Sequence, residues 1–293
     1  MRLAVYFTSG ATIKSPHNEW PIVLYSKSVL KQRKFREITG LLGSTVSLDC
    51  LDVGGDNGVI SYLLRCRGGM WKSADLDGTA VRAIRELVGD SVFQIDGGKT
   101  CFKDDEFDRV VIVDFLEHIH TDAEFAEELF RILKPGGELI INVPHVKKTV
   151  LRKLRHVIGE TDERHGHVRP GYTPDGLSHL LHGRFKIVFW KTYSKFFSEF
   201  IDTFLALAVS WTKKGQPVSS KGLIVTGRDL SGHRKIFRLY SYVYPILWLM
   251  AKLDILLFWT SGYMLIVKAK VEKSAPRQSR DLLQNFKSAA QTP

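Results

Sequence analysis

The chain has 293 residues, 44% of them hydrophobic, and a formal net charge of +11 at pH 7. This length accommodates one large domain or one domain with a substantial insertion, and the ordinary apolar content excludes a fibrous or wholly disordered chain. The apolar run Met1–Tyr6 is too short for a secretory signal, so we expect a cytoplasmic protein. Cys50, Cys66 and Cys101 lack metal-ligand spacing, and we expect reduced core residues without a disulfide or zinc role.

Positive charge is distributed unevenly along the chain. Residues 48–145 hold 10 Lys or Arg against 19 Asp or Glu, a net charge of −9, so the remainder carries +20. An acidic central region with basic flanks indicates an anionic partner, which is a nucleic acid, a lipid surface or a phosphorylated substrate. Basic side chains kept for solubility are the alternative explanation.

Residues 1–47 are expected to form a basic helical extension, with a helix over Ser26–Leu42. One face of this helix is apolar and another is basic. The basic face holds Lys27, Lys31, Arg33, Lys34 and Arg36.

A glycine-rich turn follows the first apolar run, in the sequence Leu51-Asp52-Val53-Gly54-Gly55-Asp56-Asn57-Gly58. Glycine lets a backbone approach a ligand closely and adopt turns that a Cβ forbids. A turn between a strand and a helix is where an α/β sheet builds a nucleotide site. A tight connection without a ligand is the alternative for a glycine turn considered alone.

Alternating strands and helices continue after the turn, which predicts a parallel, doubly wound sheet with its ligands at the carboxyl ends of the strands. The predicted helices include Thr79–Val88 and Asp122–Leu133, and Leu116–Ile119 is expected to begin another. The predicted strands are Ser47–Val53, Met70–Asp75, Val92–Asp96, Arg109–Asp114, Glu138–Val143 and Lys186–Thr192.

Several of these strands end in a carboxylate. Asp75 lies 23 residues after Asp52, and an acid about 20 residues past a glycine turn is placed to accept both hydroxyls of a ribose. Asp96, followed by Gly97, ends the third strand, and Asp114 ends the fourth.

The order of these motifs over residues 48–145, about a third of the chain, resembles class I S-adenosylmethionine-dependent methyltransferases, especially the type-11 group that includes ubiquinone and menaquinone methylating enzymes. The resemblance implies a Rossmann-like, mostly parallel seven-stranded sheet and S-adenosylmethionine as cofactor. It also implies a role for each motif residue: the glycine turn admits the cofactor, Asp75 holds the ribose, Leu76 packs on the adenine and Asp96 accepts its amino group. The implied cofactor-binding residues are Gly54, Gly55, Asp56, Gly58, Asp75, Leu76, Asp96, Gly97, Asp114 and Phe115, the last two lining the methionine and methyl region.

Asp56 departs from the family pattern, which has glycine at the middle of the turn. Asn57 and Gly55 tolerate left-handed conformations and would restore the turn, and the carboxylate of Asp56 could pair with the ammonium group of the cofactor. An inactive homologue that keeps the fold is the alternative. A nicotinamide dinucleotide site fits worse, because neither Gly54 nor Gly55 begins the spacing Gly-x-Gly-x-x-Gly.

Histidines are the candidate catalytic bases. His145 follows the fifth strand and is the first choice, and His118 follows the fourth. The segment Asp162–His167 is expected to form a lid that contacts the substrate, with a plain structural loop as the alternative. His165 and His167 could bind a metal as a pair, but no further ligand has suitable spacing, so we expect no metal site.

The family closes its sheet with a hairpin of the sixth and seventh strands. If Gly262–Lys270 holds the seventh strand, residues 193–261 form an apolar and basic helical insertion. This gives five regions: the extension 1–47, the core 48–192, the insertion 193–261, the last core strand 262–271 and a polar, disordered tail 272–293. Lys252, Asp254 and Pro245 interrupt the apolar run of the insertion, which argues against a membrane span and favours a helix at the membrane interface. An ordinary buried helix is the alternative.

The sequence therefore predicts a methyltransferase that acts by in-line displacement on a small, lipid-linked, isoprenoid or surface-glycan acceptor. The expected location is cytoplasmic and peripheral on the inner face of a membrane, with contact to anionic lipid through residues 193–261. An RNA methyltransferase is the second hypothesis, and a nucleic acid is less favoured because no known RNA-binding motif is present. A non-catalytic adaptor with the same fold is the third.

Overall fold

A seven-stranded sheet organises the protein, in the strand order β3-β2-β1-β4-β5-β7-β6. The computed structural model describes residues 20–55, 57–147, 149, 151–152, 155, 166–212 and 234–273. Asp56, His165 and most of the predicted tail therefore lie outside the described residues. The strands are β1 Asp49–Val53, β2 Met70–Asp75, β3 Val92–Gln94, β4 Phe107–Val113, β5 Leu133–Pro144, β6 Phe185–Tyr193 and β7 Met264–Val271.

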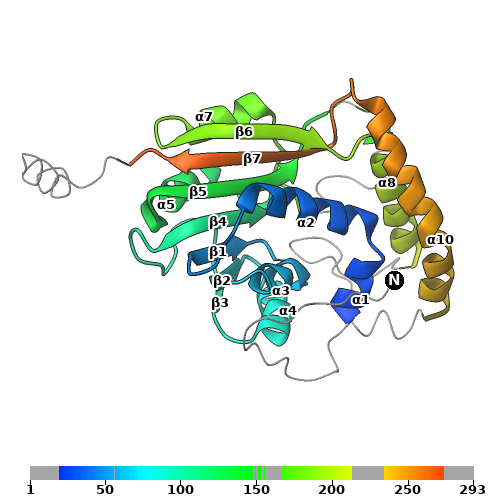
Figure 1. Ribbon diagram of the computed structural model, residues 1–293, viewed down its shortest axis with the longest axis horizontal. Helices are drawn as coiled ribbons and strands as arrows, with labels where there is room; N and C mark the ends of the chain where they lie inside the picture. The colour runs from blue at the N-terminus through cyan, green and yellow to red at the C-terminus, as the bar shows by residue number, and fades with distance from the viewer. Residues whose placement is uncertain are drawn as a thin grey trace, which may run out of the picture.

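Helices cover both faces of this sheet (Figure 1). The helices before β6 are α1 Trp20–Ser26, α2 Val29–Leu42, α3 Val59–Arg65, α4 Gly78–Val88, α5 Asp122–Ile132 and α7 Pro174–Leu181, with the 3₁₀ turn η2 Leu116–His118 after β4. One hydrophobic cluster joins the sheet to α5 and α7, and the other joins it to α2 and α3. Because both faces are covered, the carboxyl half of the central strand β4, Val110–Val113, is a continuous apolar run, and Val110, Val111 and Ile112 are wholly buried.

The predicted doubly wound sheet is confirmed. β1, β2, β3, β4 and β5 pair in parallel, while β7 is antiparallel to both β5 and β6. The carboxyl ends of the parallel strands, β6 included, therefore meet at one edge. Predicted and observed strand bounds agree closely, with Met70–Asp75 reproduced and β5 beginning five residues earlier than expected.

Three local predictions differ from the structure. The helix expected over Ser26–Leu42 is α2, which begins three residues later, at Val29, because Ser28 caps it by accepting a hydrogen bond from the Lys31 amide at 3.2 Å; the separate helix α1 ends at Ser26. The helix expected to begin at Leu116 is only the turn η2, and α5 begins at Asp122. Cys50 is buried as expected, but Cys66 and Cys101 are exposed, since each lies in a turn or loop beside an apolar segment and not within it.

The segment between β6 and β7 is helical over its described residues. It contains α8 Phe196–Thr212, α10 Arg234–Lys252 and the 3₁₀ helix η4 Leu253–Leu257. Figure 1 shows α8 and α10 side by side at the edge where β6 ends. Pro245, expected to interrupt the apolar run, lies inside α10, which continues through it.

Asp254 fastens this helical segment to the end of β6. Its buried carboxylate accepts hydrogen bonds from the amides of Lys195 at 2.7 Å and Phe197 at 2.9 Å, at the start of α8. A carboxylate at this position satisfies amide groups that the helix itself leaves without partners. Asp254, whose charge argued against a membrane span, therefore caps the start of α8.

Candidate functional site

A cavity of about 510 Å³ opens at the carboxyl edge of the sheet. Its lining comes from six regions of the chain: helix α2, the glycine turn, the segment after β4, the segment after β5, the start of the segment between β6 and β7, and the start of β7. The residues that line it include Lys34, Gly54, Gly55, Asn57, Asp114, Glu117, His118, His145, His167, Tyr193, Glu199, Asp202 and Leu205. The insertion thus borders the same cavity as the glycine turn, as the direction of β6 predicts.

The glycine turn needs glycine for steric reasons. Gly54 has φ +91°, and a Cβ there would lie 2.0 Å from the carbonyl oxygen of Val113. Gly58 is left-handed at φ +81°, and a Cβ would lie 2.9 Å from the Cα of Ile84. These two positions let the turn pass between β4 and α4, and Gly54 borders the cavity.

Asp52 of β1, to which the sequence analysis assigned no role, stabilises the strand that precedes the glycine turn. Its buried carboxylate accepts hydrogen bonds from the hydroxyls of Ser61 at 2.5 Å and Ser73 at 2.7 Å, and it pairs with Arg65 at 3.4 Å. Burial raises the pKa of Asp52, while Arg65 and the two hydroxyls oppose that rise. The network joins β1, β2 and α3, so it fixes the strand that leads into the glycine turn.

The acids at the end of β2 and after β3 are not among the described residues that line the cavity. Asp75 ends β2, is wholly buried and accepts a hydrogen bond from the Asp77 amide at 3.1 Å. Leu76 is half-buried against the core, and the exposed Asp96 accepts from the Gly98 amide at 2.9 Å. Gly97 has φ +85°, and a Cβ would lie 2.6 Å from Ile119.

Asp114 and Phe115, adjacent in sequence, have different surroundings. Asp114 lines the cavity and is left-handed at φ +46°. Phe115 is wholly buried and packs on Phe125 with ring centroids 5.0 Å apart, so it belongs to the core and not to the cavity wall.

A polar network that the sequence did not predict surrounds Asp114. Lys34 of α2 forms an ion pair with Asp114, and Asn142 donates a hydrogen bond to the other carboxylate oxygen at 3.1 Å. The hydroxyl of Tyr193 donates to Asn142. Burial by itself would lower the pKa of Lys34, but the charge and hydrogen bond of Asp114, with Glu117 beyond, raise it. Lys34 was assigned to an exposed basic face because no local pattern shows that α2 covers this edge.

His145 lies half-buried in the cavity wall. Its Nδ1 is 2.9 Å from the carbonyl oxygen of Gly262, and its backbone amide donates to the carbonyl of Tyr263 at 2.8 Å. A carbonyl only accepts, so neutral His145 carries its proton on Nδ1 and its lone pair on Nε2. This is the form in which an imidazole acts as a general base.

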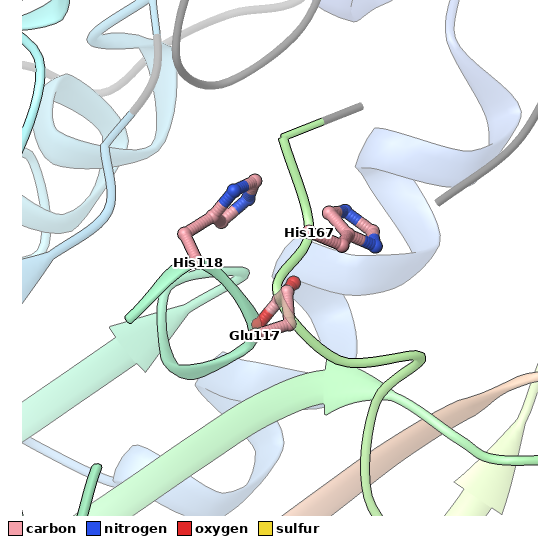
Figure 2. Close-up of side chains that lie close together, drawn as sticks. All are labelled: Glu117, His118 and His167. Atoms are coloured by element: carbon pink, nitrogen blue, oxygen red, sulfur yellow. The ribbon is translucent and has the colours of Figure 1, made fainter. Parts of the chain in front are cut away.

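Glu117, His118 and His167 lie together at the wall of the same cavity (Figure 2). One ligand atom from each lies within 4.8 Å of the others, and the rings of His118 and His167 are 4.8 Å apart between centroids. The predicted partner of His167, His165, lies outside the described residues. Spacing along the chain had argued against a metal site, and it could not show this cluster because 49 residues separate His118 from His167.

The chain is similar to known proteins in two respects: part of its sequence matches a known domain family, and its fold matches solved structures. Residues 51–141 match the family described as "Methyltransferase domain". No curated protein sequence matches the chain. A structure described as a possible histamine N-methyltransferase from Thermotoga maritima aligns with a TM-score of 0.51 and 14% identity, covering 87% of this chain and 96% of that one. The [4+2]-cyclase SpnF aligns with a TM-score of 0.52 and 16% identity, covering 90% and 98%.

At these identities the two structures establish the fold alone, and the cyclase shows that the fold serves other reactions too. The matched domain begins within β1, ends within β5 and includes the glycine turn. The chain carries a methyltransferase domain in a class I fold and is an S-adenosylmethionine-dependent methyltransferase.

Proposed function

We propose that the protein binds S-adenosylmethionine across the carboxyl ends of β1, β2, β3 and β4, in the roles that the motif order implies. Gly54, Gly55 and Gly58 admit the cofactor, with Asp56 beside them, and Asp75 accepts the ribose hydroxyls. Leu76, Asp96 and Gly97 surround the adenine, and Asp114 faces the methionine portion. Phe115 supports Asp114 from the core. The support is steric: Gly54 and Gly97 each lie where a Cβ would clash, at the ends of two strands of the same edge.

S-adenosylmethionine, when bound, supplies a methyl group made electrophilic by the sulfonium. The residues of the chain then have to orient the acceptor, exclude water and receive a proton. Nε2 of His145 takes the proton from the hydroxyl group of the molecule that is methylated. Lys34 holds the carboxylate of Asp114 in one orientation, which keeps the methionine side of the cavity fixed.

Replacing Asp75 by alanine is expected to weaken S-adenosylmethionine binding by roughly 1.5–3 kcal/mol, about 10- to 150-fold in Kd, because a charged acceptor of two hydroxyls is lost. Calorimetry with S-adenosylmethionine and S-adenosylhomocysteine measures the change. Asp75→Asn retains the packing of this buried side chain, and Asp90→Ala, at an exposed position beyond α4, is the matched control. Unchanged affinity in folded Asp75→Ala would remove Asp75 from the ribose site.

For the acceptor, we propose a small lipid-linked molecule, isoprenoid or glycan, presented at a membrane surface. The observation that carries this is an exposed apolar surface on the helices beside the cavity. Ile255 and Phe258 are each 80% exposed, and Tyr242 is 76% exposed. The other exposed apolar residues of this surface are Phe196, Phe200, Phe204, Val243, Ile246, Trp248, Leu249, Leu253, Leu256 and Trp259. So many exposed apolar side chains on neighbouring helices mark a site of membrane or partner contact.

This apolar surface and the cavity share helix α8. Phe200 and Phe204 are exposed on it, while Glu199, Asp202 and Leu205 line the cavity. An amphipathic molecule whose tail stays in the bilayer would therefore reach the cavity with its polar end. Among the described residues, no helix is long and apolar enough to cross a bilayer. Contact at the interface is the arrangement that these helices support.

Vesicle flotation tests this proposal. We expect the protein to float with anionic vesicles, less with neutral ones, and progressively less as salt rises, with a hydrophobic remainder at high salt. Phe258→Ser should weaken the association about 10- to 150-fold, since burial of an aromatic side chain contributes roughly 1.5–3 kcal/mol. Met70→Ser is the control, because Met70 is 62% exposed at the amino end of β2, on the opposite edge of the sheet. Absence from both vesicle types, together with tight and salt-sensitive RNA binding, would favour the RNA methyltransferase instead.

A further inference from the structure

We propose that Glu117, His118 and His167 bind a divalent transition-metal ion in the wall of the cavity. Two imidazoles and a carboxylate are a ligand set suited to Zn²⁺, Mn²⁺, Fe²⁺ or Co²⁺, whereas Mg²⁺ and Ca²⁺ prefer oxygen ligands. The ligand atoms lie within 4.8 Å of one another, close enough for one ion to contact all three after small side-chain rotations. Figure 2 shows the three side chains gathered at the loop that carries His167, with Glu117 and His118 rising from the turn η2.

The hydrogen bonding of His118 suits it to a metal. Its Nδ1 lies 3.0 Å from the carbonyl oxygen of Gly166, so the Nδ1 proton is donated there and the lone pair is on Nε2. Histidines that coordinate metals almost always donate the other ring nitrogen in this way, which fixes the tautomer and the ring orientation. Glu117 contributes a wholly buried carboxylate, and a buried anion is stabilised by a cation at contact distance.

Hydrogen bonds around the cluster hold the loop that carries His167 against the turn η2, which carries Glu117 and His118. The Val168 amide donates to the Glu117 carbonyl at 2.9 Å, directly linking the His167 loop to η2. Arg169 donates to the Ile119 carbonyl at 2.9 Å and pairs with Asp122. Tyr172 donates to Asp122 at 2.8 Å. The loop is therefore tied to η2 before and after His167 without any metal, and the ligands are brought together in advance.

The position of this site gives the ion a function. Three protein ligands leave coordination positions open, and the cluster lines the same cavity as Asp114 and His145. An acceptor oxygen bound to the ion would have a lower pKa, because the positive charge stabilises the oxyanion. The hydroxyl proton would pass to Nε2 of His145, the oxygen would form a bond to the methyl carbon, and the carbon–sulfur bond would break with its electron pair left on sulfur. This part of the inference rests on the proposed function and assigns oxygen as the acceptor atom.

Metal binding is measurable without an acceptor. The full chain, free of affinity tags and treated with a chelator, is titrated with Co²⁺ and followed by its visible absorption, and then with Zn²⁺ and Mg²⁺ by calorimetry. We expect about one Co²⁺ or Zn²⁺ per chain and much weaker binding of Mg²⁺. His167→Ala and Glu117→Gln should each weaken Co²⁺ binding by about 100-fold or more, since even loss of an outer hydrogen-bond partner costs 10- to 100-fold.

Two exposed histidines provide matched controls. His179→Ala and His182→Ala remove imidazoles on and just after α7, and we expect Co²⁺ affinity and spectrum to stay as in the unaltered chain. Equal Co²⁺ binding by His167→Ala and the unaltered chain, or no saturable binding by the unaltered chain, would overturn the proposal. S-adenosylmethionine affinity is measured in the same variants. Loss of the metal with cofactor binding intact would leave the proposed methyl transfer standing, whereas absent cofactor binding with a normal Co²⁺ site would refute the function alone.

Discussion

Replacing Gly54 by alanine is expected to lower the free energy of unfolding by roughly 3 kcal/mol or more and to abolish measurable S-adenosylmethionine binding. A Cβ at this residue would lie 2.0 Å from the carbonyl oxygen of Val113 and 3.2 Å from the Cβ of Phe115. The clash is with the backbone of β4, which is buried on both faces, and φ +91° disfavours any side chain. The turn would have to move away from β4, into the space proposed for the cofactor.

Urea unfolding and calorimetry with S-adenosylmethionine measure the two effects separately. Gly40→Ala is the matched control, because Gly40 lies inside α2 and nothing lies within 4 Å of a Cβ built there. That variant should be unchanged or more stable by about 0.5–1 kcal/mol, the usual gain from alanine within a helix. If Gly54→Ala were as stable as Gly40→Ala and still bound the cofactor, the close approach of the turn to β4 would not be required.

The second large effect is expected from His145→Ala, which should reduce turnover by about 10²- to 10⁴-fold while S-adenosylmethionine affinity holds. The reason is the tautomer: the Gly262 carbonyl fixes the proton on Nδ1, so Nε2 is the only ring atom that can accept the proton of the acceptor. The cofactor contacts proposed for β1, β2 and β3 do not involve this residue. Single-turnover measurements across pH separate proton transfer from binding.

The pH profile distinguishes a base from a structural histidine. A general base makes the turnover rise with pH, and His145→Ala should lose that rise while keeping its fold. His182→Ala, at an exposed position after α7, should keep both rate and profile. A His145→Ala enzyme with unchanged turnover at every pH would exclude the role and leave His145 as a residue that joins β5 to the end of the insertion.

The sequence determined the sheet and the glycine turn of this protein. Buried strand segments such as Val110–Val113 of β4 are continuous apolar runs, and the helices between the strands are bounded by caps and glycines, so each element is encoded by residues close together in the chain. The need for glycine at Gly54 and Gly58 follows from the same local order, a strand that turns at once into a helix. Acids at strand ends, such as Asp75, were placed at the ligand edge because parallel strands share a direction.

Only the tertiary structure decided which distant residues meet at that edge. Lys34 and Asp114 are 80 residues apart, and their ion pair depends on where α2 packs across the sheet. His167 reaches Glu117 and His118 through a loop whose path is set by Arg169 and Tyr172, not by any spacing in the sequence. Asp114 is left-handed and lines the cavity while Phe115 after it is wholly buried, and no residue pattern indicates this difference. The hydrophobic periodicity of a sequence shows which face of its own helix or strand a residue occupies. Contacts such as those of Lys34 and His167 depend instead on how elements far apart in the chain pack together.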